Sequence, residues 1–189
     1  MQETLSIKKM RLAIAAAAMA VIVAFSMGIG AQVAQAEDAV PYGKTASVTK
    51  SGWKYTFTNK SDTKGMTLTS VKKVSKKAAT NLKVPATYTV KKNGQSYTYK
   101  IGTIDSNAFS KASKGAKTIT ISKNVKKIKK NAFKGCSATK IVYKGKLTKT
   151  IAKKNWLKGS KVKTVQAKNN ATKVVAKAYS GKARVKAIK

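Results

Sequence analysis

The sequence predicts a β-rich solenoid of short strands and short helical turns, with about three coils of 24 residues each. The segment IDSNAFSKA at 104–112 returns as IKKNAFKGC at 128–136, and NWLKGSKVKTVQA from Asn155 aligns at the same offset of 24 with NAFKGCSATKIVY from Asn131. A fixed period of this length indicates repeats that stack on one another. The positions expected to carry the repeat are Ile104, Ala108, Phe109, Ile128, Ala132, Phe133 and Cys136.

Each copy also contains a short segment in which apolar and polar residues alternate, as they do in a half-buried strand. The side chains expected to face inward are Ile119, Ile121, Ile141, Tyr143, Val165 and Ala167. Their neighbours Thr118, Thr120, Lys140, Val142 and Gln166 are expected to form one exposed sheet face. No single coil can bury its apolar residues alone, so about three coils are needed for a stable core.

The period, the Asn-Ala-Phe signature and the apolar pair that follows it resemble the BspA-like family of bacterial leucine-rich-repeat proteins. The resemblance covers about residues 82–167, including the run VPATYTVKKNGQSYTYKIGTIDSNAF that leads into the array. It implies a leucine-rich-repeat solenoid and a secreted or cell-surface protein that interacts with other molecules. The chain departs from the family pattern in having only three copies with few leucines.

Residues 37–81 are predicted to form a small β-rich lead-in unit. Trp53, Tyr55 and Phe57 alternate with polar residues, which is typical of a strand with one face in a core. Further along, Asn93-Gly94 separates two alternating segments and predicts a tight β-hairpin. The alternative for these aromatic residues is a stacking platform for single-stranded nucleic acid, and a position in the core is favoured.

The two ends of the chain are expected to differ from the repeats. Residues 1–36 have the pattern of a secretory signal peptide: Lys8, Lys9 and Arg11 precede an apolar run, and Ala34-Gln35-Ala36 resembles a cleavage site. The alternative is an uncleaved anchor, which would be the only contact with a membrane. Residues 168–189 are predicted to be a basic cap or tail, and the sequence leaves open whether it is a strand or a loose helix.

Charge is the dominant feature of the composition. The chain has 41 basic and five acidic residues, a net charge of +36. Without residues 1–36 the balance is 38 basic against four acidic residues, or +34, and lysine supplies nearly all of the positive charge. Lysine is a strongly hydrated point charge on a flexible stem, so it favours diffuse attraction over bidentate recognition. An anionic polymer is therefore the expected class of partner.

Lysine gathers at the turn side of the later copies. The candidate binding residues for an anionic polymer are Lys126, Lys127, Lys129, Lys130, Lys153 and Lys154. The expected partners are an anionic surface polymer, host matrix or another protein. Nucleic acid is a weaker alternative because the export signal places the chain outside the cytoplasm.

Groups for catalysis are scarce, so we expect no enzymatic activity, no cofactor and no metal site. The chain contains no histidine, which excludes a histidine-based triad and an imidazole metal site. Asp105 directly precedes the Ser-Asn-Ala-Phe turn and is expected to cap backbone amides there. Cys136 aligns with Ala112 and Ser160, so it is expected to be a buried packing residue.

Overall fold

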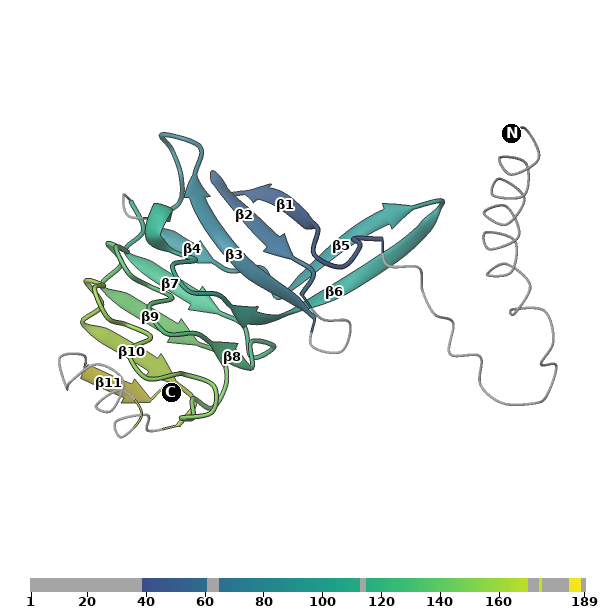
Figure 1. Ribbon diagram of the computed structural model, residues 1–189. Coiled ribbons are helices and arrows are strands. Elements are labelled where there is room, and N and C mark those ends of the chain that lie inside the picture. The colour runs from purple at the N-terminus through teal and green to yellow at the C-terminus, as the bar shows by residue number, and fades with distance from the viewer. Residues whose placement is uncertain (1–38, 61–64, 113–114, 170–173, 175–183, 188–189) are drawn as a thin grey trace, which may run out of the picture. The chain divides into compact units, whose positions relative to one another are not determined.

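Figure 1 shows the computed structural model, which describes residues 39–60, 65–112, 115–169, 174 and 184–187. Glu37–Lys189 forms one compact unit. The predicted signal segment, 1–36, lies outside the described residues. Within the described part, no helix is long and apolar enough to span a bilayer. Helix is nearly absent from this part of the chain, and the core is built between β-strands.

The first sheet has the strand order β1-β2-β3-β6-β5, and β8 also pairs with β6. Its members are β1 (Thr45–Lys50), β2 (Trp53–Thr58), β3 (Met66–Lys73), β5 (Thr87–Lys92), β6 (Gln95–Ile104) and β8 (Lys127–Ile128). The predicted hairpin at Asn93-Gly94 is confirmed: Lys92 pairs with Gln95, and both turn residues have positive φ, 51° and 76°. Asn and Gly tolerate this backbone conformation better than other residues do.

The second sheet is parallel throughout, with the order β11-β10-β9-β7-β4. Its strands are β4 (Asn81–Lys83), β7 (Thr118–Ile121), β9 (Lys140–Tyr143), β10 (Thr164–Ala167) and β11 (Arg184–Ala187), stacked as Figure 1 shows. In β7, β9 and β10 every second side chain is buried, as the alternation predicts. The residues expected to face outward are half-buried. They lie on the open face of the sheet, where side chains of neighbouring strands cover part of each one.

A second set of stacked positions lies across the core from this sheet. Ile104 of β6 pairs with Leu68 of β3 on one side and with Ile128 of β8 on the other, and Ile128 forms an isolated bridge with Ala152. All these pairings are parallel, and the last three positions are spaced by 24 residues. All four side chains are buried. The repeats therefore contribute two sets of parallel backbone pairings to the core, one in the second sheet and one through Ile104, Ile128 and Ala152.

The Asn-Ala-Phe turns form a third side of the core. Asn107 donates its backbone N–H to the carbonyl of Asn131 at 3.0 Å, and Asn131 donates to the carbonyl of Asn155 at 2.9 Å. The three asparagines have φ of 57°, 57° and 62°, the left-handed region that asparagine adopts more readily than most residues. We call this set the asparagine column. It explains why asparagine recurs at each turn.

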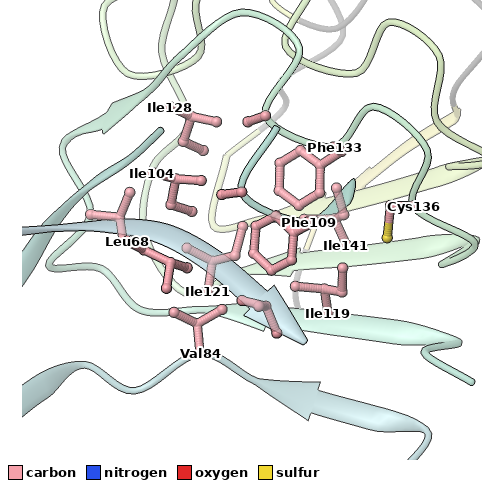
Figure 2. Packing of buried hydrophobic residues seen from close by; sticks show 14 of the residues in the cluster. Leu68, Val84, Ile104, Phe109, Ile119, Ile121, Ile128, Phe133, Cys136 and Ile141 are labelled. Atoms are coloured by element: carbon pink, nitrogen blue, oxygen red, sulfur yellow. The ribbon is translucent and has the colours of Figure 1, made fainter. Parts of the chain in front are cut away.

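Aromatic rings stack behind the asparagine column. The rings of Phe109 and Phe133 lie 4.5 Å apart and 5° from parallel, and Phe133 meets Trp156 edge-on at 5.6 Å. Figure 2 shows the two phenylalanine rings one above the other, as are Ile104 and Ile128 nearby. All seven positions predicted to carry the repeat are buried. In the third copy both Trp156 and Leu157 enter the core.

The lead-in segment and the repeats share one core. β3 pairs with β6, β4 is the first strand of the repeat sheet, and the N–H of Val71 bonds to the carbonyl of Ala108 at 2.8 Å. Trp53, Tyr55 and Phe57 are buried in the same cluster as the repeat residues. The sequence places a boundary between residues 81 and 82, whereas the structure crosses that point with a strand. The lead-in segment therefore packs against the first repeat copy and continues its core.

At the other end, the described part of residues 168–189 consists of Lys168, Asn169, Val174 and β11. β11 pairs in parallel with β10, Val185 lying opposite Val165, and Val174 is buried. The side chain of Asn169 bonds to both backbone groups of Leu147, at 2.7 and 2.9 Å. Of the two forms that the sequence leaves open for this segment, the strand is present in β11, and the described residue Val174 is helical.

Candidate anion-binding groove

A groove with a volume of about 640 Å³ lies where β6 and β8 meet Gly65, the residue directly before β3. The described lining residues are lysines, threonines, an asparagine and glycines, and they come from three successive levels of the repeat. The lining residues are Gly65, Lys100, Gly102, Thr103, Asn124, Lys126, Lys127, Thr150 and Lys153.

The repeat itself produces this groove. Gly102, Lys126 and Thr150 are spaced by 24 residues and occupy equivalent positions on neighbouring levels. The N–H of Lys126 bonds to the carbonyl of Gly102 at 2.7 Å, and Thr103 pairs with Lys127 between β6 and β8. Gly102 contributes only backbone to the lining beside Lys126.

Gly65 also lines the groove. Its φ is +69°, and a Cβ at this position would lie 2.1 Å from the carbonyl oxygen of Lys100. Only glycine fits there without moving the backbone of β6. Gly65 thus allows the start of β3 to lie close to the backbone of Lys100 at the groove.

Three of the six predicted lysines line the groove, namely Lys126, Lys127 and Lys153. Lys130 and Lys154 lie outside it at equivalent positions of two successive repeats, and both are exposed. The sixth, Lys129, is half-buried and pairs with Asp105 at 2.8 Å. The structure therefore divides the predicted patch into three groove residues, two edge residues and one lysine in an ion pair.

Asp105 is the one acidic side chain in the described part of the chain, and it holds two lysines. Lys60 Nζ lies 2.6 Å from one carboxylate oxygen and Lys129 Nζ 2.8 Å from the other, which also accepts the Ser106 N–H at 2.8 Å. Burial raises the pKa of Asp105, but the hydrogen bonds from Lys129, Lys60 and Ser106 outweigh it and lower the pKa from 3.8 to about 2. Asp105 accepts a turn amide as expected, and it also neutralises part of the lysine charge.

Sequence reasoning missed Lys100 and Lys60. Lys100 lies before the first repeat copy, so an alignment of the copies does not include it. A signal was present nonetheless: Lys100 lies two residues before Gly102, at the end of an alternating strand, and its side chain is on the exposed face. Lys60 is 45 residues from Asp105, and no local pattern indicates that pairing.

Cys136 is fully buried, as Figure 2 shows beside Ile141. Burial raises the pKa of its thiol, and the Ala138 N–H opposes that effect only in part. A thiol of this kind stays protonated at neutral pH, whereas a nucleophile needs the thiolate. Nowhere among the described residues do three His, Cys, Asp or Glu side chains gather in a way that could hold a metal ion.

Trp53, Tyr55 and Phe57 cannot provide a surface for stacked bases, because their side chains are buried in the core. Nearby, Tyr88 packs against Phe57 with ring centroids 5.5 Å apart, and the Tyr99 hydroxyl accepts the Val40 N–H at 3.0 Å. The alternative of an aromatic platform for nucleic acid is therefore wrong for these three strand residues.

Parallel ladders between successive copies, with asparagine turns spaced by 24 residues, define the class as a repeat protein. Residues 91–189, slightly more than half of the chain, match the model described as BspA type Leucine rich repeat region (6 copies). The chain therefore belongs to the BspA-type leucine-rich-repeat family.

Two solved structures are similar at low identity. One is a leucine rich cell surface protein from Faecalibacterium prausnitzii A2-165, with 16% identity, a TM-score of 0.39 and coverage of 76% of this chain and 30% of that one. The other is the pneumococcal vaccine antigen PcpA, with 20% identity, a TM-score of 0.37 and coverage of 68% of this chain and 30% of that one. The chain thus spans about a third of the length of either protein. The comparison with curated proteins gives no match.

Proposed function

We propose that this protein is an exported, strongly cationic leucine-rich-repeat scaffold that acts as a secreted or cell-surface interaction or adhesion protein. In this proposal the repeats form a short solenoid of about three coils, residues 1–36 direct export, and no reaction is catalysed. The partner is an anionic polymer or another component of the host or of the cell envelope. Membership of the BspA-type family supports the scaffold part of the proposal.

The observation that carries the choice of partner is the exposure of unopposed lysine charge along one edge of the repeats. Lys126, Lys127, Lys130, Lys153 and Lys154 are all exposed. The one acidic side chain in the described residues is already engaged with Lys60 and Lys129. A surface with this charge attracts polyanions and raises their local concentration.

Two alternatives remain. A nonspecific nucleic-acid-binding protein would use the same lysines, since phosphate contacts by lysine carry no sequence information. A purely structural envelope protein would need the repeats alone, and its lysines would serve only solubility. The predicted export signal favours an extracellular polymer over nucleic acid.

The test is retention of the protein on envelope and host-matrix fractions and on immobilised anionic polymers at low and high salt. The wild type should bind at about 50 mM salt and lose most of its binding by about 200 mM, because lysine contacts release counterions. A variant with Lys126, Lys127, Lys129, Lys130, Lys153 and Lys154 changed to Gln should bind much less at low salt. Binding by the wild type to none of these materials at low salt would contradict the proposal.

A further inference from the structure

We propose that the binding site is the groove itself and not the lysine edge as a whole, and that its ligand is a single-chain polyol phosphate. This inference rests on the proposed function and deepens it. Relative to the six predicted lysines, the proposed site includes Lys100 and excludes Lys129. Lys130 and Lys154 contribute only to the positive electrostatic potential around the groove.

The groove is long enough for more than one unit of a polymer. Neighbouring levels of a β-ladder are about 4.8 Å apart, so the column of Gly102, Lys126 and Thr150 extends about 10 Å. The volume of about 640 Å³ is within the range of small-molecule sites and is larger than one phosphate group needs. The groove is partly open to solvent and is not an enclosed cavity, so a linear chain can enter it without threading.

The charge fits phosphate. Lys100, Lys126, Lys127 and Lys153 line the groove, and each is exposed. The described lining contains no acidic side chain that would oppose an anion. Thr103, Thr150 and Asn124 add polar groups between the lysines, although Asn124 also donates to the carbonyl of Ala86 at 3.2 Å. Lysine binds phosphate as a point charge and requires no fixed fork geometry, which suits a flexible chain of phosphodiesters.

The same lining disfavours the other polyanions. It contains no aromatic side chain on which a base could stack, and stacking supplies much of the affinity for single-stranded nucleic acid. It contains no arginine for bidentate contacts to guanine or to a carboxylate. A chain with backbone phosphates and small, non-aromatic units matches what is present.

Lys129 is outside the site because Asp105 already neutralises it. The pair is 2.8 Å long and the side chain of Asp105 is only 17% exposed, so a polyanion would have to displace a hydrogen-bonded carboxylate to engage Lys129. The same argument applies to Lys60. Polymer contacts should therefore concentrate on the four groove lysines.

The experiment compares two variants of equal net charge within the same repeats. In the groove variant Lys100, Lys126, Lys127 and Lys153 are changed to Gln. In the edge variant four other lysines of the same repeats, all exposed and outside both the groove lining and the predicted patch, are changed to Gln, namely Lys134, Lys146, Lys158 and Lys163. Affinity for synthetic poly(glycerol phosphate), heparin and oligothymidine is measured by calorimetry at several salt concentrations, with circular dichroism to show that both variants are folded.

With four phosphate contacts at about 0.7 counterions each, the wild-type affinity for poly(glycerol phosphate) should fall about fiftyfold between 50 and 200 mM salt. The groove variant should bind roughly ten- to a hundredfold more weakly at 50 mM salt and lose most of that salt dependence. The edge variant should stay within about threefold of the wild type. This pattern supports the groove as the binding site. Weaker wild-type binding of heparin and oligothymidine than of poly(glycerol phosphate) supports the assignment of the ligand.

Equal losses in the two variants would overturn the groove while leaving the proposed function in place, because they would show a diffuse lysine field. Tighter wild-type binding of oligothymidine or heparin than of poly(glycerol phosphate) would overturn the assignment of the ligand. Failure of the wild type to bind any of the three polymers at low salt would overturn the proposed function itself.

Discussion

Replacing Phe133 with Ala tests whether the stacked rings hold the repeats together. Phe133 is fully buried and is in contact with two aromatic neighbours, Phe109 at 4.5 Å and Trp156 at 5.6 Å. Truncating a buried phenylalanine to alanine costs about 3 to 5 kcal/mol, and loss of two ring contacts favours the upper half of that range. For a chain of this length the melting temperature should fall by roughly 6 to 20 °C.

The assay is urea unfolding followed by circular dichroism, with thermal melts in parallel. Phe133→Leu, which keeps most of the volume, should cost well under half as much, and it remains measurable if Phe133→Ala does not fold. Lys130→Gln on the exposed edge of the same turn should change stability by about 0.5 kcal/mol or less. If Phe133→Ala and Lys130→Gln are equally stable, the assignment of inward and outward positions is refuted, and the repeat register with it.

Two further predictions concern single polar groups. Because the folded pKa of Asp105 is about 2, below the unfolded 3.8, its stabilisation is complete above about pH 4 and is lost as the pH falls towards 2. The wild type should lose about 1 to 2 kcal/mol of unfolding free energy over that window, after allowance for the exposed lysines, and Asp105→Asn should not. Equal losses in the two proteins would show that the ion pairs of Asp105 do not stabilise the fold. The thiol of Cys136 should fail to react with Ellman's reagent at neutral pH in the folded protein and react fully in urea, since it is buried and protonated. Rapid reaction in buffer would show that the core opens at this position.

Local patterns in the sequence predict the local parts of the fold. Strand alternation depends on neighbouring residues, and the hairpin at Asn93-Gly94 depends on two residues that tolerate positive φ, so both can be inferred from short windows. The burial of Phe109 and Phe133 follows from the repeat, because two copies of one motif place equivalent side chains in register. These features need no knowledge of distant contacts.

Features that depend on distant pairings could not be predicted. Leu68 enters the same ladder as Ile104 at a spacing of 36 residues, outside the repeat period, so nothing in the sequence joins β3 to the repeats. The pairing of Lys60 with Asp105 has the same cause. The sequence alone does not separate the groove lysines from the other lysines of the predicted patch. That separation depends on the positions of Gly65 and Lys100, which are distant in the sequence from the patch.

The asparagine column has a consequence for how such a protein changes over generations. Asn107 donates its N–H to Asn131, and Asn131 donates to Asn155, in the same direction and at the same spacing of 24 residues, so the duplication of one complete repeat would supply each broken hydrogen bond of the column with an equivalent one. A gain or loss of part of a repeat would shift asparagine away from the left-handed position and send core residues to the surface. Whole repeats are therefore the natural unit of heritable change in this chain, and each duplication would also lengthen its lysine-bearing edge by one level.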